Sequence, residues 1–110
     1  MKKYVFLITT LITCFLCSQS AFALSEKDIS AEEWFQKGMT YLEANQYEKA
    51  IDAFSKTLDL NLRYARAYIN RGNAWSKKGD YDRSISDYTK ALQIDPSFDE
   101  AKRTLKLYNK

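Results

Sequence analysis

Residues 65–98 decide the fold, and they read ARAYINRGNAWSKKGDYDRSISDYTKALQIDPSF. The 34 residues before them, 31–64, read AEEWFQKGMTYLEANQYEKAIDAFSKTLDLNLRY and repeat the pattern. A fixed period of this length is typical of a repeat architecture, in which neighbouring units stack and bury a shared core. The matching positions are Trp34, Gly38, Tyr41, Tyr47, Ala50, Ile51, Phe54 and Leu58, followed by Tyr68, Gly72, Trp75, Tyr81, Ser84, Ile85, Tyr88 and Leu92.

Helix start and stop signals divide each stretch into two helices. Ser30 and Glu33 have capping-box spacing, so the first helix is predicted to begin at Ala31. Gly79 suits the left-handed conformation after a helix, and Asp80 caps the next one. The predicted helices cover about residues 31–44, 47–59, 64–78 and 81–94.

A fifth helix is predicted after Pro96, which cannot continue the fourth. Ser97 and Glu100 form a second capping-box pattern, and the helix should run to about Tyr108. Its apolar residues fall on one face: Phe98, Ala101, Leu105 and Tyr108. We therefore predict an all-α fold, an α-solenoid of two helical hairpins (residues 31–64 and 65–98) closed by a capping helix at 99–110.

The first 23 residues have the pattern of a secretory signal peptide. Lys2 and Lys3 precede an apolar run of about 14 residues, shorter than the roughly 20 that span a membrane. Ala21 and Ala23 supply the small residues of a cleavage site, which would leave residues 24–30 as an N-terminal extension. The alternatives are an uncleaved anchor and a lipoprotein. We expect an exported chain, periplasmic or secreted, without stable membrane insertion after cleavage.

Composition argues against catalysis and cofactors. The chain has no histidine, and both cysteines, Cys14 and Cys17, lie in the predicted signal peptide. The commonest general base and transition-metal ligands are then missing, so we expect no enzyme activity, cofactor or metal. We interpret Asp80, Asp82 and Asp87 as a helix cap and a solvated face. Removing Lys2 and Lys3 changes 17 basic against 14 acidic residues to 15 against 14, which gives no case for nucleic acid.

The repeated pattern resembles the tetratricopeptide repeat family. Residues 65–98 match its motif closely, including Pro96, and residues 31–64 depart from it at Thr57 and Leu62. In physical terms, Gly38 and Gly72 let a partner helix approach closely, because they carry no side chain. The resemblance implies a module that binds a protein or peptide on a concave groove, lined mainly by the first helix of each repeat.

The resemblance also indicates which side chains would line this groove. An apolar stripe in the first helix, Phe35, Met39 and Leu42, would supply anchors, although it could equally pack against other helices of the chain. Ile69 shares the corresponding face of the third helix. Polar contacts would come from Arg66, Asn70, Asn73 and Arg103.

Some tetratricopeptide domains bind acidic chaperone C-termini through lysines, arginines and asparagines of the groove. The matching positions here hold Phe35, Met39, Asn70, Glu100 and Thr104, of which only Asn70 fits, so this mode is rejected. The chain is thus expected to hold an extended segment or a helix of a partner protein. The alternative is a self-assembling homo-oligomer, because two and a half repeats leave incomplete stacking ends.

Overall fold

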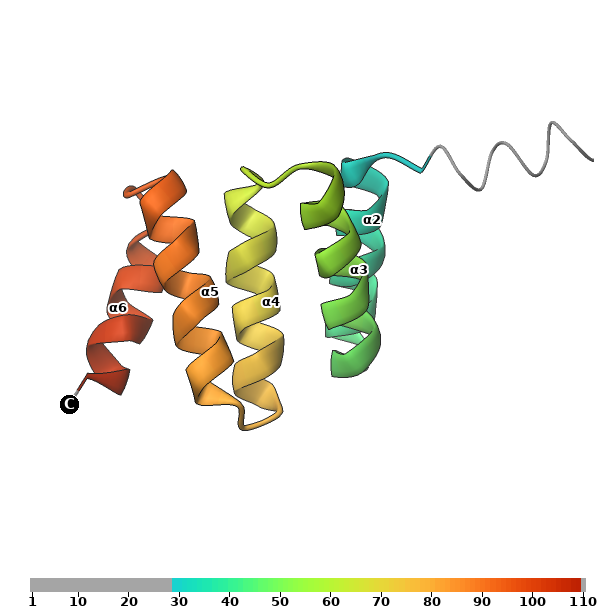
Figure 1. The fold of residues 1–110 in the computed structure, drawn as a ribbon. Helices are drawn as coiled ribbons and strands as arrows, with labels where there is room; N and C mark the ends of the chain where they lie inside the picture. Colours follow the sequence, from blue (N-terminus) through green and yellow to red (C-terminus); the bar gives the residue numbers. More distant parts are fainter. Residues whose placement is uncertain (1–28, 110) are drawn as a thin grey trace, which may run out of the picture.

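The computed structural model describes residues 29–109 and shows five α-helices there, with no strand (Figure 1). They are α2 (Ala31–Glu43), α3 (Tyr47–Leu60), α4 (Ala65–Lys77), α5 (Tyr81–Ile94) and α6 (Asp99–Tyr108). The predicted all-α class is confirmed. Residues 1–28 lie outside this description, and with them the predicted signal peptide and its cleavage residues Ala21 and Ala23.

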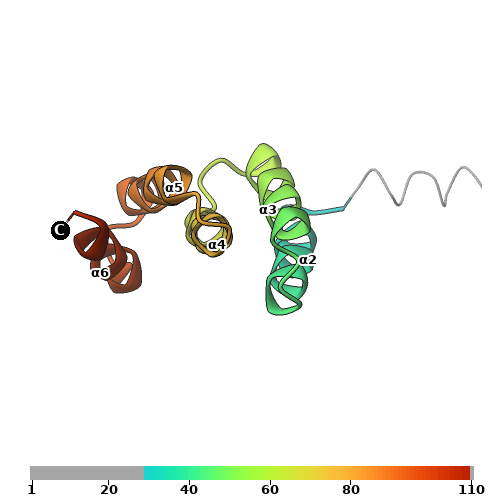
Figure 2. The same ribbon diagram turned by 90° about the horizontal axis from the view of Figure 1, so that it is seen from below.

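The helices follow one another in space as they do in sequence. Each helix packs on the next one along the chain, and α2 also contacts α4. Seen almost end-on, α2, α4 and α6 lie on one side of the stack, and α3 and α5 lie on the other (Figure 2). This is the predicted solenoid of two hairpins and a capping helix, and it gives one face built from first helices.

Two glycines allow the helices of each hairpin to pack closely. A Cβ atom at Gly38 would lie 2.5 Å from the ring of Phe54, and one at Gly72 would lie 3.1 Å from the ring of Tyr88. An aromatic ring of the second helix therefore rests on the backbone of the first helix in both repeats. This explains why glycine and an aromatic residue recur together at the fixed period.

The core runs without interruption through both repeats and into α6. Its buried members include Phe35, Phe54, Tyr68, Tyr88 and Ala101. Thr57, which departs from the family pattern, is fully buried, and its hydroxyl donates to the carbonyl of Ala53 one turn earlier. The polar atom is satisfied within its own helix, so the departure leaves the stack intact.

The helix ends confirm three of the predicted signals and correct one. Ser30 and Glu33 form the capping box, the Asp80 carboxylate accepts from the backbone N–H of Arg83, and Gly79 has a φ of 85°. The second capping box is wrong. The Ser97 hydroxyl instead donates to the Asp95 carboxylate over 2.6 Å, and α6 begins after Phe98 without a side-chain cap.

Within residues 29–109, no helix combines the length and apolar character needed to cross a membrane.

Candidate functional site

A hollow of about 380 Å³ lies on the face built from first helices. Its walls come from both repeats and from α6, so it forms only when the whole stack is assembled. The lining residues are Leu42, Asn45, Tyr47, Asn73, Ser76, Lys77, Tyr88 and Glu100. Two residues of the predicted binding set, Leu42 and Asn73, are among them. We call this hollow the groove pocket.

Asn73 is held in place by a tyrosine that belongs to the core. Tyr88 is buried against Gly72, and its hydroxyl donates to the Asn73 side-chain oxygen. A tyrosine hydroxyl is protonated at neutral pH, and burial raises the pKa of Tyr88 further. With its oxygen occupied, Asn73 has its amide NH₂ to offer to a carbonyl in the groove pocket.

A second hydrogen bond ties the capping helix to α4 beside the groove pocket. The hydroxyls of Ser76 and Tyr108 lie 2.7 Å apart, and the Tyr108 ring packs against Tyr81 with ring centres 5.5 Å apart. These contacts fix α6 against both helices of the second repeat. Glu100, in the first turn of the same helix, lines the groove pocket together with residues of α4.

Phe35 corrects the predicted apolar stripe. Its side chain is 1% exposed, and its ring lies 5.7 Å from that of Phe54 and 5.0 Å from that of Tyr64. The guanidinium of Arg66 covers it from outside, 5.1 Å from the ring centre. Phe35 is therefore a core residue and no surface anchor. Ile69 on α4 is buried in the same way.

The other predicted residues keep some access to solvent. Met39 and Leu42 are half-buried at the edge of the core, and Asn70 is also half-buried. Arg66 and Arg103 are exposed, and Arg103 Nε donates to the Asp99 carbonyl on its own helix over 3.4 Å. Met39, Asn70, Arg66 and Arg103 are not among the lining residues of the groove pocket.

Tyr64 joins the start of α2 to the segment before α4. Its hydroxyl donates to the Glu32 carboxylate. Burial, and then this bond to Glu32, raise the pKa of Tyr64 to about 12. The same bond, together with one from Gln36, lowers the pKa of Glu32. Since the Tyr64 ring also packs on Phe35, this contact explains why the first position of the stripe is closed.

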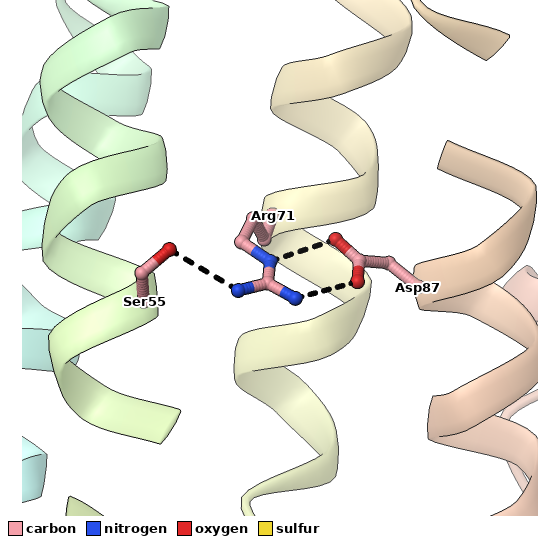
Figure 3. A network of polar contacts seen from close by, with 3 residues as sticks. All are labelled: Ser55, Arg71 and Asp87. Atoms are coloured by element: carbon pink, nitrogen blue, oxygen red, sulfur yellow. Dashed lines mark hydrogen bonds and ion pairs between the residues drawn. The ribbon is translucent and has the colours of Figure 1, made fainter. Parts of the chain in front are cut away.

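A polar network between the repeats was missed by sequence analysis (Figure 3). Arg71 makes a bidentate ion pair of 2.8 Å with Asp87, and its remaining terminal nitrogen donates to the Ser55 hydroxyl over 3.1 Å. Asp87 is 5% exposed, so our interpretation of it as part of a solvated face is wrong. One repeat earlier the equivalent residues are Lys37 and Ala53, and this paired difference is the sequence signal.

Six of the lining residues were not in the predicted binding set: Asn45, Tyr47, Ser76, Lys77, Tyr88 and Glu100. The tyrosine at position 88 was assigned to the core by its spacing, which is correct for its ring. A buried tyrosine hydroxyl usually needs a hydrogen-bond partner. From this rule, a hydrogen bond between Tyr88 and a polar residue of the neighbouring helix, such as Asn73, could have been expected.

Other parts of the described chain are weaker candidates for a site. A hollow of about 550 Å³ on the outer face of α2 is lined by Ile29 and residues of that helix alone, so no second wall encloses a ligand. Within residues 29–109, histidine, cysteine, aspartate and glutamate side chains form no group of three that could hold a metal ion.

Comparison with known proteins agrees with this architecture. The family model described as "Tetratricopeptide repeat" matches residues 31–64 and 65–98. The small glutamine-rich tetratricopeptide repeat-containing protein 2 of Mycosarcoma maydis is 35% identical over 78 residues, which are 70% of this chain and 22% of that protein. The chain thus corresponds to about a fifth of this relative.

Solved structures show the same stack. The crystal structure of MamA matches with a TM-score of 0.70 and 32% identity over 72% of this chain and 46% of that one. The TPR2B domain of yeast Sti1, solved as a complex with pHsp70, matches with a TM-score of 0.63 and 31% identity over 64% of this chain and 57% of that one. By its two matched repeats and by its fold, the chain belongs to the tetratricopeptide repeat family.

Proposed function

We propose that this chain is a non-catalytic module that binds an extended segment or a helix of a partner protein in the groove formed by α2, α4 and α6. The observation that carries the proposal is the groove pocket, where Tyr88 holds Asn73 with its amide NH₂ available. The complex of the Sti1 domain with pHsp70 supports it, because it is a partner complex of the same fold. Such repeats typically act as interaction modules without catalysis.

The chemistry of the groove pocket suits a peptide backbone with an apolar side chain. The Asn73 amide can donate to a backbone carbonyl, which recognises the chain independently of its sequence. Leu42 gives an apolar contact in the groove pocket, and Met39 can adapt its shape at the edge. Asn70, Arg66 and Arg103 would contact a longer ligand outside the groove pocket.

Partner binding is favoured over self-assembly by the surface of α6. Lys102 and Lys106 are exposed on this last helix together with one large apolar side chain, Leu107, which is 70% exposed, and Lys102 pairs with Asp99 over 3.8 Å. Burying these charges against another copy would cost desolvation free energy. We therefore expect one chain per particle in solution, which light scattering would measure.

Export is part of the proposal. It rests on the lysine-led start, the short apolar run and the small residues Ala21 and Ala23. Mass spectrometry of the chain isolated from its own cells should show Leu24 as the first residue. A chain that retains Met1 to Ala23 would contradict cleavage.

Site-specific photo-crosslinking in those cells tests the binding proposal. A photoreactive residue would replace Lys77, an exposed residue of the groove pocket, or Lys56, an exposed control on α3. We expect a heavier adduct with a partner from position 77 and none from position 56. Adducts from both positions alike would contradict a groove-specific partner, and an adduct of twice the chain mass would indicate self-assembly.

A further inference from the structure

We propose that the groove pocket selects an internal segment with a basic side chain that pairs with Glu100 and an apolar side chain that packs on Leu42. This inference rests on the proposed function and adds the chemical class of the ligand. It is carried by the juxtaposition of these two residues with Asn73 in one hollow.

The Glu100 carboxylate is available for such a pair. The ion pairs among residues 29–109 are Arg71 with Asp87, Lys78 with Glu48, Arg83 with Asp80 and Lys102 with Asp99. Glu100 is exposed and belongs to none of them. It lines the same hollow as Tyr88 and Asn73. The carboxylate is therefore near the bond that orients Asn73.

Lys77 is the cation of the groove pocket, and it lies away from Glu100 along the helices. Glu100 is in the first turn of α6 and Lys77 is in the last turn of α4, while both helices begin along the upper edge of the stack in Figure 1 and run in the same direction. A basic ligand residue can thus approach Glu100 without meeting Lys77 directly. The opposite charges at the two ends also favour one direction of the bound segment.

The other cations near the groove do not create a site for an acidic chain end. Arg66 lies over the Phe35 ring and near Glu32, and Arg103 donates to a carbonyl of its own helix. The lining of the groove pocket holds one cation and one anion, so it does not concentrate positive charge for a terminal carboxylate. An internal segment brings no terminal carboxylate, and its positive side chain would pair with Glu100.

Selection from a displayed library of random 12-residue segments, flanked by fixed glycine and serine residues, tests this inference. The purified chain, Glu100→Lys and Asp52→Lys would be screened in parallel. Asp52 is exposed on α3, so its variant changes the charge of the protein by the same amount away from the groove. Glu100→Gln provides a milder variant, and circular dichroism would check that each protein is folded.

We expect the wild-type chain and Asp52→Lys to enrich segments that carry lysine or arginine beside an apolar residue. Glu100→Lys should lose this preference, and a wild-type-selected peptide should bind it about fivefold to tenfold more weakly, with Glu100→Gln between the two. Enriched pools that lack basic residues, or that are the same for Glu100→Lys, would overturn the inference while leaving groove binding intact. Failure of the wild-type chain to enrich any segment would overturn the proposed function itself.

Discussion

At the scale of single residues, Arg71 is the residue whose side chain connects the two repeats through hydrogen bonds. It extends from α4 to Asp87 on α5 and to Ser55 on α3, so one guanidinium joins three helices and both repeats. The pairing with Asp87 raises the pKa of Arg71 further, although burial acts against this. The planar guanidinium fits the carboxylate with two parallel bonds, which lysine could not make.

Replacing Arg71 by alanine would leave the Asp87 carboxylate buried without its partner. We expect Arg71→Ala to lower the free energy of unfolding by about 2–3 kcal/mol, measured by urea denaturation. Arg83→Ala is the control, because Arg83 pairs with Asp80 at the surface over 3.6 Å and should cost less than about 1 kcal/mol. Equal losses in the two variants would show that the network between the repeats contributes little.

The raised pKa of Tyr64 predicts that the folded chain loses stability at alkaline pH. Its pKa is about 12 in the folded chain against 10.0 for the ordinary side chain. Between these values the unfolded chain loses the proton and the folded chain keeps it, so stability is full below pH 10 and falls as the pH rises toward 12. Melting temperatures across this range should fall less steeply for Tyr64→Phe. An unchanged slope in that variant would contradict the assignment.

At the scale of helices, the two hairpins pack in the same way, but they should differ in how well they tolerate a side chain in place of the packing glycine. A Cβ atom added at Gly38 would lie 2.5 Å from the Phe54 ring, whereas one added at Gly72 would lie 3.1 Å from the Tyr88 ring. Alanine favours a helix by about 1 kcal/mol over glycine, so the outcome depends on whether the ring can move. Comparing the alanine variants of Gly38 and Gly72 therefore tests how closely the helices of each hairpin pack.

We expect Gly38→Ala to destabilise the chain by about 1–3 kcal/mol, because the added methyl forces Phe54 out of place. Gly72→Ala should cost less than Gly38→Ala, because the added Cβ would meet Tyr88, Asp87 and the Ser84 carbonyl at 3.1–3.3 Å, which smaller shifts relieve, and because the helix gains propensity. Thermal unfolding of the two variants would measure the difference. If Gly72→Ala were the more damaging variant, the packing described for the first hairpin would be incorrect.

The helices could be predicted from sequence because their signals are local. The capping box of Ser30 and the left-handed Gly79 depend on neighbouring residues only. The capping box predicted at Ser97 was wrong because the Ser97 hydroxyl donates to Asp95, which lies just before Pro96. The prediction that Phe35 is a surface anchor was wrong for a different reason. Tyr64, from the segment before α4, covers the Phe35 ring, and the pattern of residues within one helix does not reveal a contact with a distant segment.

At the scale of the whole molecule, the stack creates a surface that no single repeat has. The groove pocket needs Leu42 from the first repeat, Asn73 from the second and Glu100 from α6. Family resemblance was enough to predict which face of the stack forms the groove. The hydrogen bond from Tyr88 to Asn73 could not be predicted in this way, because it joins two helices and residues that are 15 positions apart. Stable stacking and the proposed ligand binding therefore depend on the same residues.

The central claim is that this groove holds a partner segment, and an NMR titration tests it most directly. A 12-residue peptide selected by the chain would be added to the isotope-labelled protein, and backbone amide shifts would be followed. We expect the largest changes at Leu42, Asn73, Ser76, Lys77 and Glu100, with little change on the outer sides of α3 and α5. Changes centred on those outer sides, with the groove residues unaffected, would contradict it.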